Sequence, residues 1–312
     1  MDAPARTNLT TPGPEGTLSA LQWVLRLGVF LCFLGHGSYA LLAKPEWAAF
    51  FGVVGMPPDA GLVLMPWVGL LDLTIASFAL ASPRPIVFLW AAVWCLWTAA
   101  LRPLSGLGMW EFWARAGNYG IPIAFLALGS WPRSLREWLS PVTSGPVSAE
   151  RLRAGGFVLR TSIVLFLIGH AGLALFQQKE GLLSLYAKAG LPSTIGGVAL
   201  APTIGWFELA LALAVLLKPV RALLLAVCAL KIAVGLLSPA AGAYWWEFIE
   251  HGADYMAPIA LILIGKALGA RMRVPESPQT LVPVGAASVV PAPAGAAPGG
   301  VANRAAEPNP ST

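Results

Sequence analysis

Charged residues are scarce in this chain, and cysteine and histidine are scarcer still. Only 11% of the 312 residues are charged, whereas 57% are hydrophobic and the mean hydropathy is +0.70. This balance lies outside the range of soluble globular domains and within the range of polytopic membrane proteins. The net charge of +5 does not indicate nucleic-acid binding, because the basic residues follow a membrane topology.

The few cysteines and histidines exclude several common redox and metal centres. Cys32, Cys95 and Cys228 all fall in apolar segments, and none belongs to a C-x-x-C pair. The sequence also lacks a haem-attachment motif and a glycine-rich dinucleotide turn. No two of the three histidines are close in sequence, so no metal site is predicted. A b-type haem held by His36 and His170 is a less favoured interpretation.

Long apolar runs make up most of the chain. About 20 apolar residues in a helix cross a hydrocarbon core of about 30 Å. Eight runs approach this length, and the fourth barely does so: 22–43, 60–82, 85–102, 118–132, 158–176, 196–217, 219–238 and 254–270. The sequence therefore predicts an all-α integral membrane protein with eight transmembrane helices.

Polar and basic stretches predict the topology. The positive-inside rule places the basic linker 133–157 in the cytoplasm, because arginine exceeds glutamate in and just after it. The stretch before the eighth segment contains Glu247, Glu250 and Asp254 without a basic residue, so it is predicted to face outward. Both termini are then cytoplasmic in the cell's inner membrane. Segment 1–21 lacks a signal-peptide pattern, and segment 271–312 has the Pro- and Ala-rich composition of a disordered tail.

Two copies of one pattern divide the chain. "WEFWARAGNYGIP" begins at residue 110, and "WEFIEHGADYMAP" begins at residue 246, an offset of 136. His36 matches His170 at an offset of 134. Repeats 22–132 and 158–270 each contain four segments, so both enter the membrane in the same direction. The predicted architecture is two parallel four-helix bundles packed side by side.

The repeated polar stretches are predicted to meet an intramembrane histidine at the outer side of each bundle. His36 lies about 15 Å along its helix from Arg26. The two predicted sets are His36, Glu111, Arg115, Asn118 and Tyr119, and His170, Glu247, His251, Asp254 and Tyr255. We interpret each stretch as an outer lid, with Glu111 above His36 and Glu247 above His170. The alternatives are an aromatic belt, a helix-stabilising ion pair and helix caps.

Asp72 and Glu208 are acidic residues at matching positions near the middle of the second and sixth segments. An ionised side chain there costs at least about 2.5 kcal/mol. Lys231 lies at a similar depth in the seventh segment and can pair with Glu208, whereas its counterpart in the first copy is Cys95, or Thr98 if a small gap is allowed. Asp72 is therefore a candidate proton carrier, and a neutral carboxyl group that joins two helices is the alternative.

The Gly-His near the end of the first span, in "FLGHG" and "LIGHA", and the acidic residue in the second, in "GLLDL" and "GWFEL", resemble the DoxX-like membrane proteins. The resemblance covers both repeats, although this chain is a fused tandem. It implies four-helix bundles that bind a quinone or another lipid-like molecule, with His36, Asp72, His170 and Glu208 at the matching positions. It also implies a soluble redox protein as a partner.

Three functions remain open on the sequence. The first is a membrane oxidoreductase, or its quinone-interacting subunit, in which His36, His170, Asp72 and Glu208 act on the quinone oxygens. The second is a non-catalytic scaffold for a soluble protein. The third is a small-molecule or proton-coupled transporter, because parallel repeats also occur in that class.

Overall fold

A computed structural model describes residues 14–143, 145–177, 180–195 and 197–273. Residues 1–13 and residues 274–312, which are most of the predicted tail 271–312, lie outside the described residues. The longer helices are α1 (Pro14–Leu41), α3 (Pro58–Ala81), α4 (Pro85–Leu104), α6 (Ala116–Leu128), α8 (Ala149–Leu175), α10 (Leu200–Leu217), α11 (Arg221–Ala240) and α13 (Gly252–Arg273). The shorter elements are η1 (Pro45–Trp47), α2 (Ala48–Gly52), α5 (Met109–Trp113), α7 (Leu135–Leu139), α9 (Glu180–Lys188), β1 (Thr194–Ile195), β2 (Val198–Ala199) and α12 (Trp245–Glu250).

The helices confirm the all-α class and fit a multi-pass membrane protein. Within the described residues, seven helices are long and apolar enough to cross a membrane. The fourth predicted segment forms α6, whose 13 residues span only about 20 Å and do not meet this criterion. Large apolar side chains such as Trp67, Trp90 and Phe207 are exposed on the spanning helices, as expected of surfaces that face lipid.

Several helix boundaries differ from the sequence prediction because local capping fixes them. The α8 helix begins nine residues before the predicted 158, since the Ser148 side chain accepts a hydrogen bond from the backbone N–H of Arg151. Ser134 caps α7 in the same way inside the predicted linker. The sixth predicted segment forms α10. This helix begins at Leu200 rather than at 196, because the preceding residues form an antiparallel hairpin in which Thr194 pairs with Ala199.

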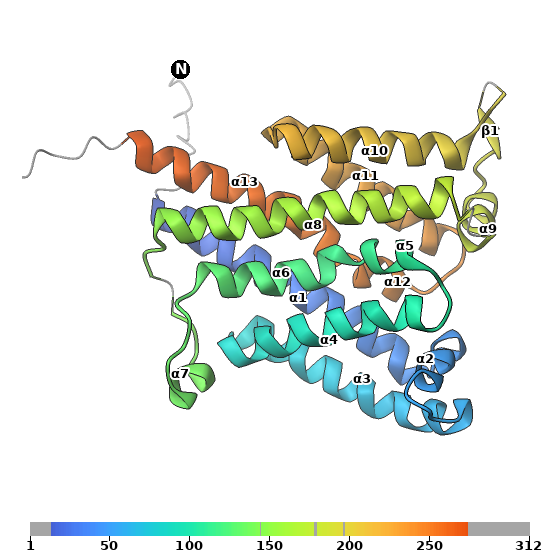
Figure 1. Cartoon of the computed structure of the whole chain (residues 1–312), viewed down its shortest axis with the longest axis horizontal. Helices are drawn as coiled ribbons and strands as arrows, with labels where there is room; N and C mark the ends of the chain where they lie inside the picture. The colour runs from blue at the N-terminus through green and yellow to red at the C-terminus, as the bar shows by residue number, and fades with distance from the viewer. Residues whose placement is uncertain (1–13, 144, 178–179, 196, 274–312) are drawn as a thin grey trace, which may run out of the picture. The chain divides into compact units, whose positions relative to one another are not determined.

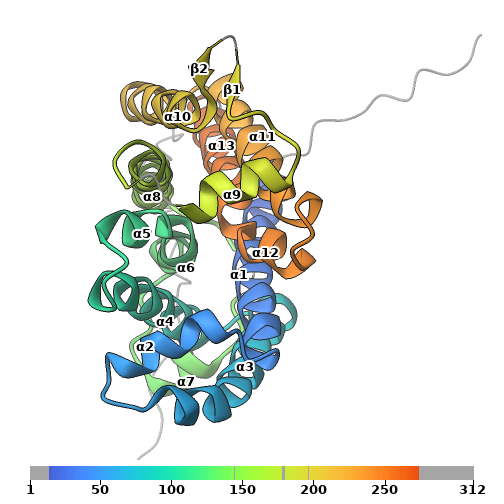
Figure 2. The same cartoon turned by 90° about the vertical axis from the view of Figure 1, so that its right-hand side faces the viewer.

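The two repeats interleave rather than forming separate bundles, because their fourth helices, α6 and α13, each pack against helices of both halves. The α1 helix packs against α3 of its own half and against α13 of the other half (Figure 1). In the same way α8 packs against α10 and α6, and the short helices α12 and α5 lie beside α1 and α8 (Figure 2). Gly35 and Gly169 permit this packing, because a Cβ atom there would collide with the backbone of Glu250 and Ala114, respectively.

The short helices gather at one end of the described chain. Figure 1 shows α2, α5, α9 and α12 toward that end, while α7, the N-terminal end of α1 and the C-terminal end of α13 lie at the opposite end. Both repeated polar stretches, on α5 and α12, therefore lie at the same end of the long helices. This arrangement places them where α1 and α8 end, near His36 and His170.

Candidate functional site

A cavity of about 160 Å³ lies among α1, α3 and α4 of the first half. Its walls are mainly apolar and aromatic, and η1 and α2 contribute Trp47, Phe50 and Phe51. Polar atoms reach it from His36, Asp72, Thr98 and Arg102. The predicted pair His36 and Asp72 therefore lines a single cavity within the spanning helices.

Asp72 provides the carboxyl group of this first cavity. The residue is only 3% exposed, and its Oδ1 atom has no hydrogen-bond partner among the described residues. Close packing of Gly69 against the backbone of Gly37 holds α3 near α1. The Trp94 side chain is a hydrogen-bond partner of the carboxyl group. Because a buried carboxylate without a cation is costly, Asp72 is suited to hold a proton or to contact a polar group of a ligand through Oδ1.

His36 lies between the first cavity and a cluster of charged residues. Its ring meets Trp47 edge to face at 5.7 Å between centroids. Its Nε2 atom lies 3.6 Å from Oε2 of Glu250, which belongs to the other half of the chain. His36 therefore connects the cavity of the first half with a polar residue of the second.

A second cavity, of about 360 Å³, lies at the equivalent place in the second half. His170 and Glu208 line it as His36 and Asp72 line the first, and α9 takes the place of α2. The pKa of Tyr186, on α9, is raised by burial and, to a smaller extent, by the charge of Glu208. Glu111 and Arg115 reach this cavity from the first half, so both repeats build it.

A buried ion pair at the carboxyl group distinguishes the second cavity from the first. Lys231 Nζ lies 3.5 Å from Glu208 Oε1, and both residues are 3% exposed, which confirms the predicted pair. The residue at the Lys231 position in the first half is Cys95, which is buried and carries no positive charge. Glu208 thus has a cationic partner, whereas Asp72 has none among the described residues.

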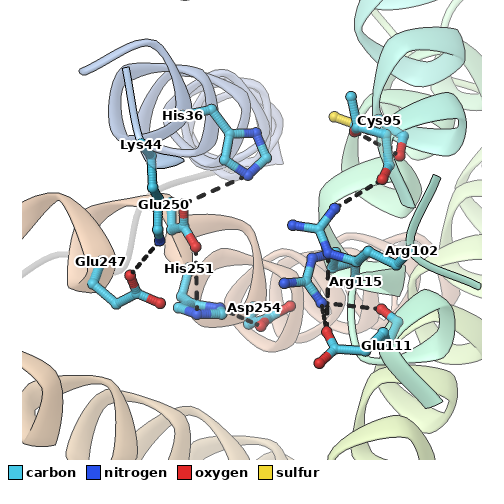
Figure 3. Close-up of polar contacts among 11 residues, drawn as sticks. His36, Lys44, Cys95, Arg102, Glu111, Arg115, Glu247, Glu250, His251 and Asp254 are labelled. Carbon is cyan, nitrogen blue, oxygen red and sulfur yellow. Dashed lines mark hydrogen bonds and ion pairs between the residues drawn. The ribbon is translucent and has the colours of Figure 1, made fainter. Parts of the chain in front are cut away.

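The charged cluster occupies the junction between the two halves (Figure 3). On the first-half side, Glu111 Oε2 lies 2.5 Å from Arg115 Nη1 and 3.9 Å from Arg102 Nε. This is the helix-stabilising pair considered above, now joined by a second, buried arginine. Lys44 Nζ lies 3.2 Å from Glu247 Oε2 and joins the end of α1 to α12.

The helices that carry the predicted lids pack against the opposite halves. The helix that carries Glu247 packs beside α1, near His36, and the helix that carries Glu111 packs beside α8, near His170. The physical reason is the close approach that Gly35 and Gly169 permit across the repeat boundary. The prediction is wrong for Glu111, which lines the second cavity with His170. Glu247 and His251 line the cavity of His170, as predicted, and the rings of His251 and His170 lie 6.3 Å apart.

The remaining predicted residues support the short helices. The ring of Tyr119 stacks on Phe112, and Tyr255 stacks on Phe248 and donates a hydrogen bond to its carbonyl oxygen. Asn118 lies inside α6, and Asp254 lies inside α13, where it contacts His251. Neither residue is the N-cap that the sequence allowed as an alternative.

Arg102, Thr98 and Glu250 join the site although the sequence did not single them out. Arg102 ends the third predicted segment, where an arginine is expected at the membrane surface, yet it is only 4% exposed. Its position in the sequence carries no sign of this burial. Glu250 has Ala114 at its position in the first half, so a search for repeated residues passes over it.

The comparisons with known proteins identify no relative of the chain. No family model, curated protein or solved structure matches the chain significantly.

Proposed function

We propose that the first cavity binds the ring headgroup of a quinone or another lipid-like molecule. The observation that carries this proposal is an apolar cavity within spanning helices whose few polar atoms include those of the buried residues His36, Asp72 and Arg102. A membrane-soluble ligand with a polar ring needs this combination, because its tail stays in apolar surroundings while its oxygen atoms require partners. The resemblance to DoxX-like proteins favours the same ligand class.

The size of the cavity favours a single ring. An apolar cavity of about 150 Å³ can hold a benzene molecule, and the first cavity measures about 160 Å³. Ligand sites for larger molecules are usually at least about 300 Å³. The chain would therefore hold a headgroup of one ring, and the tail would leave the cavity toward the lipid.

The polar residues suit the oxygen atoms of such a ring. His36 and Arg102 carry N–H groups that can donate to a carbonyl oxygen. Asp72 can supply or accept a proton, because its buried carboxyl group lacks a cationic partner among the described residues. Reduction of a quinone to a quinol takes up two electrons and two protons, and in this proposal a soluble redox protein supplies the electrons.

The first half carries this function rather than the second. The carboxyl group of Glu208 already lies beside Lys231, so the second cavity has a charge pair at the position where the first has a carboxyl group without a cationic partner among the described residues. Binding a neutral ring there would require moving or desolvating this pair, at additional cost. We therefore assign the second cavity no quinone.

A filling substitution with a matched control tests the proposal. Val68 lines the first cavity one turn before Asp72, and its repeat counterpart Ile204 does not line the second. In the purified protein, Val68→Phe should weaken binding of a short-chain benzoquinone at least about tenfold, because steric overlap costs 1 to 3 kcal/mol. Ile204→Phe should leave the affinity within about twofold. Isothermal titration calorimetry measures both.

The alternative functions predict other results in the same preparation. If the protein does not bind the benzoquinone, or binds it equally in both variants, the proposal is wrong. A co-purifying soluble protein without a bound quinone would then favour a scaffold, and proton-coupled uptake into vesicles would favour a transporter.

The proposed topology places the polar cluster outside the cytoplasm. Its support is the arginine-rich linker around α7, at the end of the long helices opposite α5 and α12 (Figure 1). Leu135 and Ala243 are exposed at the two ends. In intact cells, a membrane-impermeant thiol reagent should label Ala243→Cys, and it should label Leu135→Cys only after permeabilisation. The reverse pattern would invert the topology.

A further inference from the structure

Three potential metal ligands meet where α12 ends. One side-chain ligand atom from each of Glu247, Glu250 and His251 lies within 4.8 Å of the others. The group faces α1, where His36 lies 3.6 Å from Glu250 (Figure 3). Two carboxylates and two imidazoles thus converge from helices of both halves.

Glu250 is the residue that requires an explanation. It is 95% buried, since its relative exposure is 5%, and its Oε2 atom has no hydrogen-bond partner among the described residues. A buried carboxylate without hydrogen bonds is strongly unfavourable unless a cation compensates it. The imidazole of His36 lies 3.6 Å from this oxygen and carries a positive charge only when protonated.

His251 has the orientation typical of a metal ligand. Its Nδ1 atom lies 3.4 Å from Oδ2 of Asp254, which is 1% exposed. Its Nε2 atom faces Glu250 at 4.0 Å from Oε1. Metal-bound histidines commonly hold a carboxylate with one ring nitrogen and bind the ion with the other. Asp254 would therefore be the positioning residue of His251.

The equivalent place in the first half contains a built-in cation. At the offset of 136, Glu247 corresponds to Glu111 and His251 corresponds to Arg115. In the first half, Arg115 neutralises Glu111 directly. The second half has His251 in place of this guanidinium, and it has a carboxylate, Glu250, where the first half has Ala114.

The charge balance of the junction also favours an added cation. The group in Figure 3 contains four carboxylates, from Glu111, Glu247, Glu250 and Asp254, and three permanently charged side chains, from Lys44, Arg102 and Arg115. Arg102 and Arg115 form ion pairs with Glu111, and Lys44 forms an ion pair with Glu247. The negative excess therefore falls on Glu250 and Asp254.

We propose that Glu247, Glu250 and His251 bind one divalent transition-metal ion. Mixed imidazole and carboxylate ligands suit Zn²⁺, Mn²⁺ and Fe²⁺. The side chains of Glu247 and His251 are 30% and 27% exposed, so an ion can enter from that side. The site does not rest on quinone binding.

Metal binding by the full-length protein tests the proposal. The purified protein is stripped with a chelator and titrated with Zn²⁺ and, separately, Mn²⁺. Retained metal is measured by mass spectrometry after gel filtration. We expect one ion per chain in the wild type and at least about tenfold weaker binding in Glu250→Gln, because this change removes a ligand charge but keeps the shape. Glu46→Gln, an exposed carboxylate on η1, should bind as the wild type does.

A second variant keeps the test decisive if Glu250→Gln does not fold. Asp254→Asn retains all three ligands and changes only the partner of His251, so it should weaken binding about 10- to 100-fold. Equal binding by wild type and a folded Glu250→Gln or Asp254→Asn variant would overturn the proposal. Failure of the wild type to retain either ion would overturn it as well.

Discussion

Arg26 and Arg160 perform the same structural task in the two halves. Arg26 donates hydrogen bonds to the carbonyl oxygens of Ala79 and Leu80 at the end of α3. Arg160 does the same for Val215 and Leu216 at the end of α10. The last carbonyl groups of a helix lack partners within it, so each arginine joins the first helix of its half to the end of the second.

Replacing either arginine should destabilise the protein measurably. In Arg26→Met and Arg160→Met the side chain keeps an unbranched apolar stem but loses its donors, so each change should cost about 1 to 2 kcal/mol of unfolding free energy. Thermal unfolding in detergent measures the effect. Arg84→Met is the control, because the Arg84 bond to Ser82 is local. Equal losses in all three variants would show that general loss of charge is responsible.

The charged residues show what the sequence can and cannot predict. Helix depth alone predicted that Lys231 and Glu208 would pair, because two long antiparallel spans leave little freedom in their register. Repetition identified His36 and Asp72, which line one cavity. The same criterion missed Glu250, which has no acidic counterpart in the first half. A difference between two copies is therefore as informative as a shared residue.

At the scale of elements, the short helices α5 and α12 set the arrangement of the long ones. Each packs against the first long helix of the opposite half, and a glycine marks each crossing. Membrane helices commonly approach closely at small residues, because packing rather than the hydrophobic effect drives their association. The packing of the fourth helices against both halves accompanies these two crossings.

Adding a methyl group at a crossing should weaken the contact between the halves. Gly35→Ala and Gly169→Ala would each place a Cβ against backbone atoms, and such overpacking costs about 1 to 3 kcal/mol. The matched control is Gly265→Ala in α13, where a Cβ meets nothing within 4 Å. The control should be neutral or stabilise by up to about 1 kcal/mol. A loss in the control equal to that at the crossings would contradict the packing described here.

The interleaving of the two halves could not be predicted from the sequence. Helices that are apolar on all sides give no periodic signal of which face meets which partner. Gly35 and Gly169 indicate that a close contact exists but not which helix makes it. The sequence therefore predicted the helices with errors of several residues at some ends, and predicted two separate bundles where the halves interleave.

At the scale of the whole described chain, duplication has produced two related but unequal sites. Both halves keep a histidine and a carboxyl group beside a cavity. The first cavity is smaller and has no built-in cation beside its carboxyl group, whereas the second contains Lys231. The charged junction between them combines residues from both halves. A ligand site in the first half and a metal site at the junction are the two consequences that we propose.

Photolabelling with a quinone locates the ligand most directly. A short-chain azidoquinone is bound to the purified protein and activated by light, and the labelled peptides are identified by mass spectrometry. The account predicts labelling of the residues around the first cavity, within 47–54, 65–72 and 94–102, and its loss when an excess of unlabelled quinone is present. Labelling confined to the second half, or spread without competition over lipid-facing residues, would contradict it.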